Sequence, residues 1–494
     1  MTSMTTLESL VSPLPDVYGR LRVDRAFIYT ADPQRAVLPN GSILIQGSTI
    51  LAVGSSAEVD AAEASLGPTS GAKRRIDAFG KMILPGFVNN HWHEANALIA
   101  LGSLDLDADD KTTLPNELAG GQNSPGVSVL FNKLFGLTNN LPPEMCYLFA
   151  LRAYVSQLRS GATCVADFGS TNQPEHLERA ALATGIRTTV SVLSVDGECN
   201  PAETGYSRLQ DTDKILSRME EVILRCKADV SGRLRAMPTV LWPLNASDEL
   251  LKGAVALAEK YNTPWGTHLS AAPSESPTSQ RYFGARSVER LQNLGVLSKR
   301  LISAHTSFLD AEEFAWLVKA GVNLTYSPQK YPLTGEASIT ANKMMVRFVQ
   351  ANAPVTASSD GDALPMGFMS EAMRTVWSVC NDSMLDPSFV PPTRALSMAT
   401  RVPAESLGLL SDVGSLAVGK KADFMIVPID DYRYDGVRRP LQSFLISGGS
   451  GDVETVVVDG RILVDKKTAT FVDEKALSAA FLQSAAGLSQ ALKG

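Results

Sequence analysis

The chain contains eight short apolar strings rich in β-branched residues, and helical periodicity separates most of them. Short apolar strings bounded by turn residues are typical of strands that are buried on both faces. Eight parallel strands that alternate with helices close into a barrel, so the pattern predicts an α/β fold with a (β/α)₈ TIM-like barrel. The strings are 84–93, 161–169, 185–193, 234–243, 263–268, 300–305, 321–328 and 354–361.

Both ends of the chain have a different texture. Short apolar runs with Gly and Asn turn signals fill residues 23–77, and similar runs return in 413–427 and 453–464. The last of these carries an Asp-Gly pair, which is typical of a hairpin turn. We therefore expect a small β-sandwich domain built from N- and C-terminal segments. The predicted boundaries are a leader at 1–22, the small domain at 23–80 and 408–472, the barrel at 81–407 and a C-terminal helix at 473–494.

Two helices between the strings have clear capping signals. Asp310 can cap one that Gly321 ends, and Ser247 can cap another that continues to Tyr261. The leader, rich in Ser, Thr and Pro, is expected to be either a loose segment or an arm that forms an interface. The stretch from 96 to about 143 is longer than a βα connection requires, and we expect a lid there.

The charge and cysteine content of the chain indicate which kinds of molecule it binds. The net charge is -7 and no basic tract accompanies it, which argues against nucleic acid and anionic lipid as partners and favours a small-molecule substrate. The five cysteines are widely spaced without a CxxC pair, so neither a disulfide framework nor a thiolate zinc site is expected. With no signal peptide and no apolar run long enough for a membrane span, we predict a cytoplasmic protein. We also expect the chain to form a homo-oligomer, a dimer or larger.

Four of the five histidines fall at the ends of predicted strands. His91 and His93 lie two residues apart, and in an extended strand such positions face the same side. His268 ends the fifth string, His305 the sixth and Asp360 the eighth. The C-terminal strand ends of a (β/α)₈ barrel form its catalytic rim. We therefore predict that His91, His93, His268 and Asp360 hold one divalent metal ion, which activates a water molecule.

Neighbours of these residues have structural as well as functional interpretations. Trp92 is predicted to form a wall of the substrate pocket, although strand-end aromatics are commonly packing residues. Glu94 follows the histidine pair and is assigned to the substrate pocket, with a purely structural carboxylate as the alternative. Asp167, at the end of the second string, can cap the segment that follows it and receives no catalytic role.

The segment ILPGFVNNHWHE resembles the first-strand signature PG(F/L)(V/I)(N/D)xHxH of the amidohydrolase superfamily. GTHLS, SAHTSFLD, SSDG and GSLAVGKKADFMIV agree with that family in order and spacing, so the resemblance covers about 23–472. The chain looks most like the branch of triazine hydrolases and cytosine and guanine deaminases. This implies one metal ion, zinc or alternatively iron. The fourth string, LRAMPTVLWP, ends without the lysine of the two-metal members.

The resemblance also implies catalytic roles. Asp360 would accept the proton of the attacking water while it touches the metal. His305 would donate a hydrogen bond to the atom that gains charge in the transition state. Tyr326, at the end of the seventh string, stands where this family lines its substrate pocket.

One position departs from the family pattern. Deaminases of this branch carry HxxE at the fifth strand, and here the residue three after His268 is Ala271. Glu94 or Glu275 could substitute for the missing acid. The absence of a glutamate at position 271 favours substrates whose leaving group departs readily. Such substrates include an activated amide, a carbamate, a thiocarbamate, a urea or a substituted heteroaromatic ring. We predict a metal-dependent amidohydrolase that attacks a C–N bond, or a related C–S, C–O or C–X bond, of such a substrate. The alternatives are a heterocycle deaminase and a non-catalytic binding barrel.

Overall fold

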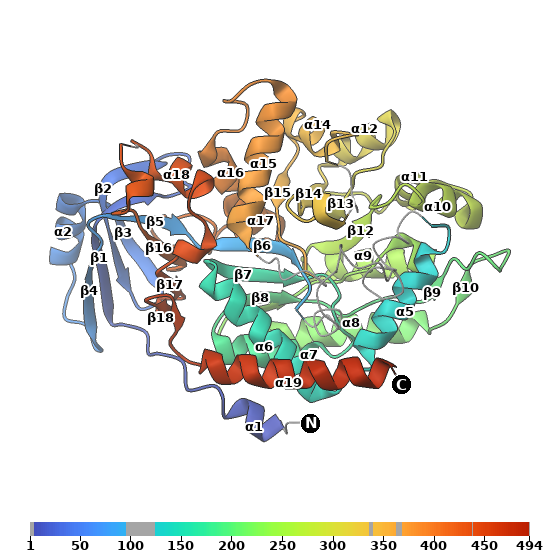
Figure 1. The fold of residues 1–494 in the computed structure, drawn as a ribbon, viewed down its shortest axis with the longest axis horizontal. Coiled ribbons are helices and arrows are strands. Elements are labelled where there is room, and N and C mark those ends of the chain that lie inside the picture. Colours follow the sequence, from blue (N-terminus) through green and yellow to red (C-terminus); the bar gives the residue numbers. More distant parts are fainter. Residues whose placement is uncertain (1–3, 95–123, 335–338, 362–367, 437, 494) are drawn as a thin grey trace.

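The computed structural model describes residues 4–94, 124–334, 339–361, 368–436 and 438–493. A barrel of strands and helices lies beside a sheet domain that both ends of the chain build (Figure 1).

The barrel consists of two four-stranded parallel sheets, ordered β11-β8-β7-β6 and β12-β13-β14-β15. A parallel bridge from Thr239 to Gly266 joins one pair of edges, and the Asp360 amide donates to the His91 carbonyl (3.1 Å) at the other. Each predicted string contains one strand of the barrel, which confirms the expected fold. The strands are β6 (Phe87–Trp92), β7 (Ala162–Asp167), β8 (Arg187–Val190), β11 (Leu234–Ala236), β12 (Trp265–Leu269), β13 (Leu301–His305), β14 (Asn323–Tyr326) and β15 (Val355–Ala357).

Helices surround these strands (Figure 1). The Asp310 side chain accepts hydrogen bonds at the start of α12, and Ser247 caps α9, as the sequence predicts. Most of the expected lid, residues 95–123, lies outside the described residues, and α5 follows it. The helices are α5 (Val127–Asn139), α6 (Pro143–Arg159), α7 (Pro174–Thr184), α8 (Thr212–Lys227), α9 (Asp248–Tyr261), α10 (Glu275–Phe283), α11 (Ser287–Asn293), α12 (Ala311–Ala320), α13 (Tyr331–Thr334), α14 (Met344–Gln350), α15 (Met369–Met384), α16 (Pro392–Ala399) and α17 (Arg401–Ser406).

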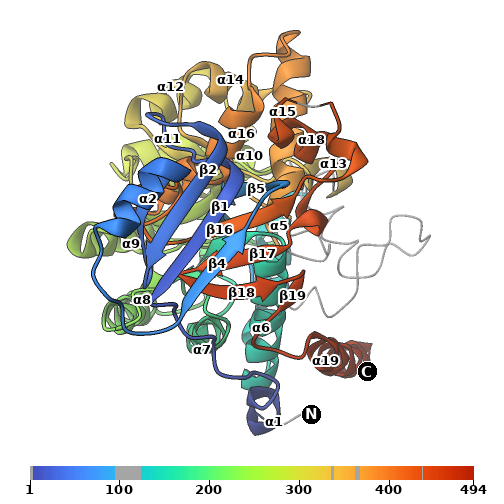
Figure 2. The same cartoon turned by 90° about the vertical axis from the view of Figure 1, so that its left-hand side faces the viewer.

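The small domain is one sheet to which both ends of the chain contribute (Figure 2). β16 from the C-terminal part pairs antiparallel with β5 from the N-terminal part. Apolar residues of these strands form a separate core that includes Val23, Ile43, Phe424 and Val457. The elements are β1 (Arg20–Tyr29), β2 (Val37–Gln46), β3 (Thr49–Ser55), α2 (Ser56–Ala64), β4 (Lys73–Asp77), β5 (Lys81–Pro85), β16 (Phe424–Pro428), β17 (Thr455–Val458), β18 (Arg461–Asp465) and β19 (Thr468–Ala469). The helix α18 (Pro440–Ile446), between β16 and β17 in the chain, packs against α15 and α16 of the barrel.

The chain passes from the small sheet to the barrel at Gly86, which differs from the expected boundary at residue 81. Lys81–Pro85 pairs within the small sheet, whereas Phe87–Trp92 pairs in the barrel. A Cβ on Gly86 would lie 2.1 Å from Thr163 Oγ1, so the close approach of the two segments requires glycine. The apolar character continues across this glycine, and for that reason the sequence shows one string there.

The leader is packed, which corrects the expectation of a loose segment. Its helix α1 (Met4–Glu8) buries Leu7, and Val11 forms a β-bridge with Val472. Apolar contact with the barrel therefore orders this segment. The C-terminal helix α19 (Glu474–Lys493) runs along α6 (Figure 1).

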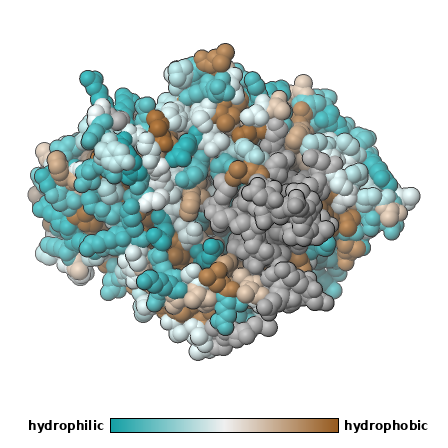
Figure 3. All heavy atoms as spheres, in the orientation of Figure 1, coloured by the Kyte–Doolittle hydropathy of each residue, from teal (hydrophilic) through white to brown (hydrophobic). Residues whose placement is uncertain are grey.

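On the face shown in Figure 3 the small domain is mainly hydrophilic, with isolated hydrophobic residues. Such scattered residues are normal for a surface in water. Among the described residues, no helix has both the length and the apolar character that crossing a membrane requires.

Candidate metal centre and active site

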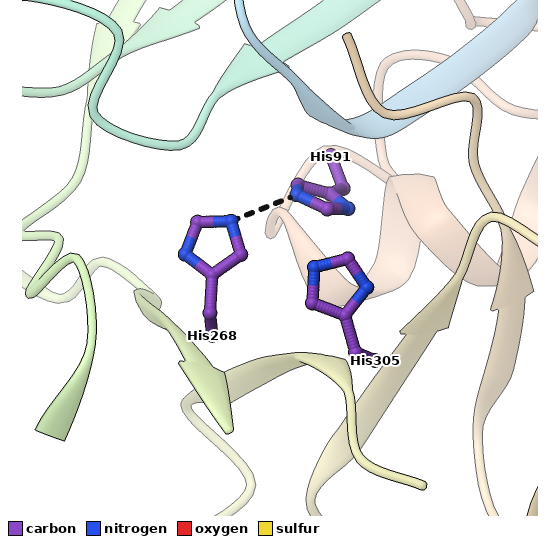
Figure 4. Close-up of side chains that lie close together, drawn as sticks. All are labelled: His91, His268 and His305. Carbon is purple, nitrogen blue, oxygen red and sulfur yellow. Dashed lines mark hydrogen bonds between the residues drawn. The ribbon is translucent and has the colours of Figure 1, made fainter. Parts of the chain in front are cut away.

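Imidazoles from three separate strand ends converge at the C-terminal rim of the barrel (Figure 4). His91 Nε2 lies 3.1 Å from His268 Nε2, and His93 Nε2 lies 3.3 Å from the same atom. Asp360 Oδ1 is 3.8 Å from His91 Nε2 and 3.7 Å from His93 Nε2. The structure thus brings together all four predicted metal ligands, with His305 beside them.

These separations suit a metal ion. Metal–ligand bonds of about 2.0–2.2 Å in a tetrahedral site put neighbouring ligand atoms roughly 3.4 Å apart. The observed spacing of 3.1–3.8 Å brackets that value. The imidazole nitrogens and the carboxylate oxygen are all hydrogen-bond acceptors that face one point, so the site requires either shared protons or a cation between them. A set of imidazoles and one carboxylate is typical of the ligands of zinc.

The protonation states also suit ligation. Burial lowers the pKa of His91 and of His268 well below the usual value, and the neighbouring histidines lower both further. A neutral imidazole is the form that binds a metal. The Nδ1 atom of His268 lies 2.7 Å from the Leu241 carbonyl oxygen, a contact that fixes the ring and leaves Nε2 toward the site.

Asp360 is ionised despite its burial. Burial by itself would raise the pKa of this carboxyl group, but the Lys330 ammonium holds the pKa well below its usual value. The Lys330 ammonium donates to Asp360 Oδ2 at 2.9 Å. The carboxylate is therefore available as a ligand and as a base.

The backbone is unusual where the side chains of the second half of the barrel enter the site. His305 has φ 70°, Asp360 has φ 55° and Ser270, two residues after His268, has φ 47°. Residues other than glycine rarely adopt this left-handed conformation, and it occurs mainly where the surrounding structure enforces it. The fold thus tolerates local strain at three strand ends of the rim.

His305 is held by a phenol. Its Nδ1 lies 3.0 Å from the Tyr331 hydroxyl, which accepts a hydrogen bond from the Ser327 amide (2.8 Å). The proton of this phenol is then available for Nδ1, so that Nε2 would carry the imidazole proton. Nε2 lies 3.9 Å from Asp360 Oδ2. His305 also groups with His91 and His268 as a possible set of ligands, and its role as a donor stays a prediction.

The predicted substrate contacts occupy different positions. Trp92 is 6% exposed and its ring lies beneath Gly361, where a Cβ would approach it to 3.1 Å. Tyr326 is fully buried and its hydroxyl donates to the Thr306 carbonyl (2.9 Å). In these positions both residues support the site, and their contact with a substrate stays a prediction.

Glu94 lies in a buried carboxylate pair. Burial raises its pKa well above the usual value, and neighbouring Asp167 raises it further. Asp167 Oδ2 accepts the Gly169 amide (3.0 Å) and the Ser191 hydroxyl (2.9 Å), so Asp167 caps the loop after β7 as the sequence suggests. Neither oxygen of Glu94 has a hydrogen-bond partner among the described residues.

Glu275 lies near the position that Ala271 leaves without an acid. Its Oε1 accepts the Ser270 amide and its Oε2 accepts the Ala271 amide, both at 2.8 Å. Burial raises its pKa to about 7. Because both oxygens bind the backbone, the geometry favours a structural role in the loop after β12.

Lys330 and Tyr331 are the site residues that the sequence interpretation missed. They follow the seventh strand in the segment YSPQKYPL and contact Asp360 and His305. The available signal is one lysine close to a strand end, between two prolines. Lysine is common on surfaces, so that signal is weak by itself.

The profile of the amidohydrolase family matches residues 82–463. The chain belongs to the amidohydrolase family. The expected class is thereby confirmed, and the protein is a hydrolase that acts on carbon–nitrogen bonds other than peptide bonds.

Several proteins that are similar to this chain are deaminases. A 5'-deoxyadenosine deaminase of Methanobrevibacter smithii is 26% identical over 439 residues, covering 88% of this chain and 91% of the relative. A 5-methylthioadenosine/S-adenosylhomocysteine deaminase of Desulforamulus reducens is 25% identical, covering 92% and 96%. Among solved structures, an adenosine deaminase from Xanthomonas campestris with bound zinc has a TM-score of 0.80 at 21% identity, covering 97% and 100%. Atrazine chlorohydrolase from Arthrobacter aurescens, complexed with zinc, has a TM-score of 0.76 at 22% identity, covering 94% and 100%.

Proposed function

We propose that this amidohydrolase binds one zinc ion and hydrolyses the bond between a heteroaromatic ring and its exocyclic amino group, releasing ammonia. The observation that carries the proposal is the convergence of His91, His93 and His268 Nε2 with Asp360 Oδ1. These four residues would hold the ion. A divalent ion in such a site lowers the pKa of a water molecule toward neutrality.

The surrounding side chains supply the remaining steps. Asp360 takes the proton of the attacking water and passes it to the departing nitrogen. His305, oriented through Tyr331, donates a hydrogen bond to the atom that gains negative charge. Phe168 packs edge-on against His91 with ring centroids 4.8 Å apart and keeps water from that side of the imidazole.

An adenine nucleoside is the substrate class that the relatives favour. Deaminases of 5'-deoxyadenosine and of 5-methylthioadenosine/S-adenosylhomocysteine resemble this chain over most of its length. Trp92, Glu94 and Tyr326 are the proposed substrate-binding residues. Glu94 is the carboxyl group closest in sequence to the histidine pair and the proposed proton donor to the ring.

Ala271 favours a second candidate function. Without a glutamate at this position, the site suits substrates whose leaving group needs less protonation, such as a carbamate, thiocarbamate or aryl urea. The same four ligands and Asp360 would serve that reaction. The two candidates differ in the product, which is ammonia in the first and a larger amine, alcohol or thiol in the second.

A substrate panel tests the proposal. We expect zinc-loaded protein to release ammonia from 5'-deoxyadenosine, 5'-methylthioadenosine or S-adenosylhomocysteine, detected by coupled assay and by the ultraviolet change of the purine. Hydrolysis of aryl ureas or carbamates without ammonia release from purines would select the second function. No turnover of any of these compounds by protein of verified zinc content would contradict both. We also propose a cytoplasmic homo-oligomer, which light scattering of the purified protein and cell fractionation would test.

A further inference from the structure

The segment after β14 reaches back over the proposed metal site. Lys330 Nζ lies 2.9 Å from Asp360 Oδ2, and the two side chains are only 5% and 4% exposed. Next to it, Gln329 Nε2 donates to the Ser359 carbonyl at 3.0 Å. Two neighbouring residues of one turn therefore bind two neighbouring residues at the end of the eighth strand. This double attachment distinguishes Lys330 from a surface lysine that meets a carboxylate by chance.

The two oxygens of the Asp360 carboxylate have different partners. Oδ1 accepts the Gly361 amide at 2.7 Å and faces His91 and His93 at 3.8 and 3.7 Å. Oδ2 accepts the Lys330 ammonium. One oxygen is thus directed toward the metal ligands, while a protein cation occupies the other.

The charge of Lys330 affects both the Asp360 carboxylate and a metal ion bound near it. A buried carboxylate is costly unless a cation accompanies it, and its cost rises steeply when the partner is removed. Lys330 supplies that charge before any metal ion arrives. Once a divalent ion binds near Oδ1, two cations share one carboxylate, and they repel each other strongly in a buried site.

We propose, on the basis of the proposed metal site, that Lys330 is a positioning residue that acts as an internal counter-cation. It fixes the orientation of the Asp360 carboxylate in the metal-free protein through Oδ2, and its charge weakens the binding of the metal ion. The site is therefore preformed, and the ion is held less tightly than its ligands alone would hold it.

Metal binding tests the second half of this proposal. Lys330→Met removes the charge but keeps much of the side-chain length, Lys330→Arg keeps the charge, and Lys319→Met on the exposed face of α12 is the matched control. We expect metal-free Lys330→Met to melt several degrees below wild type, and zinc to raise its melting temperature more than it raises that of wild type. In competition with a chelator, Lys330→Met should bind zinc at least about tenfold more tightly, as removal of a buried repelling charge predicts. Lys330→Arg should stay close to wild type. An affinity in Lys330→Met that equals or falls below that of wild type would overturn the proposal.

A double-mutant cycle on metal-free protein tests the first half independently of zinc. Asparagine at position 360 needs no counter-cation, so Asp360→Asn should restore most of the stability that Lys330→Met loses. Additive losses in the double variant would reject the counter-cation. This cycle also separates the two proposals: if wild type binds no zinc, the metal site fails, whereas the coupling between Lys330 and Asp360 is still measured.

Discussion

Two buried aspartates at strand ends of the barrel differ in what they bind. Asp167, in the half formed by β6, β7, β8 and β11, is bound to its own loop, whereas Asp360, in the half formed by β12 to β15, faces the histidines. Asp167 accepts the Gly169 amide and the Ser191 hydroxyl, but Asp360 lies between imidazoles and Lys330. The first half contributes the His91 and His93 pair and packing residues. The second contributes His268, the proposed base Asp360, the proposed donor His305 and the cation of Lys330. A position on the rim is therefore insufficient to identify a catalytic residue. The hydrogen-bond partners of each aspartate distinguish one that caps a loop from one that is available as a base.

The largest expected effect comes from the two aspartates. Asp360→Asn should abolish turnover of every substrate, by at least about a thousandfold, because an amide cannot accept the proton of the attacking water. Asp167→Asn should instead lower the melting temperature and retain most of the turnover per folded molecule, because the residue caps a loop. Steady-state kinetics with parallel measurement of zinc content and thermal unfolding would check both. Equal loss of turnover in the two variants would remove the distinction between the halves.

Replacement of either histidine in the first half of the barrel should lower the metal content of the protein. We expect about one transition-metal ion per chain in wild type. His91→Ala or His93→Ala should lower that content, because each removes one of the four proposed ligands. His176→Ala on α7 is the control and should retain the ion. Elemental analysis of protein purified in the presence of zinc provides the measurement. Two tightly held ions in wild type would contradict the mononuclear site.

His305 should affect chemistry more than metal binding. If it donates to developing charge, His305→Asn should reduce kcat on the order of a hundredfold while zinc content stays nearly unchanged. Tyr331→Phe removes the phenol that orients the ring and should give a smaller loss of the same kind. Loss of the ion in His305→Asn would instead make His305 a ligand, as its distance from His91 and His268 permits.

The convergence of the proposed ligands could be predicted from the sequence because two local rules suffice. The spacing of His91 and His93 follows from strand periodicity, and the rim position of His268, His305 and Asp360 follows from the barrel. Lys330 could not be predicted in this way, because its contact with Asp360 depends on how the turn after β14 folds back in three dimensions.

The boundary at Gly86 was also hidden from the sequence. Its two flanking strands are both apolar, and only the packing against Thr163 shows where one domain ends. A similar limit applies to Glu275, whose seven-residue separation from His268 gives no indication that its oxygens bind the Ser270 and Ala271 amides. Positions set by periodicity were therefore predictable, whereas positions set by loop closure were not.

Replacement of Glu94 and of Glu275 should have different effects on activity across substrates with good and poor leaving groups. Glu94 has no hydrogen-bond partner among the described residues, whereas both oxygens of Glu275 bind backbone amides. We expect Glu94→Gln to lose activity steeply with poor leaving groups such as alkylamines and little with nitrophenolate or a thiolate, which depart without protonation. Glu275→Gln should retain most activity throughout. A flat response of Glu94→Gln across a leaving-group series would exclude it as the acid and weaken the deaminase proposal.

The smallest effect concerns the stability contribution of Glu275. Burial raises its pKa from 4.5 to about 7, so the folded protein binds this proton more tightly than the unfolded chain does. Its stabilising contribution is present below about pH 4 and is lost as the pH rises through about 7. Glu275→Gln cannot ionise, so the free energy of unfolding of wild type should fall relative to this variant between these pH values, by on the order of 3 kcal/mol at most. Denaturant unfolding at several pH values measures the difference, with exposed Glu259→Gln on α9 as the control. Parallel pH profiles for wild type and Glu275→Gln would show that this carboxyl group ionises freely in the folded protein, and the loop after β12 would then have to open to water.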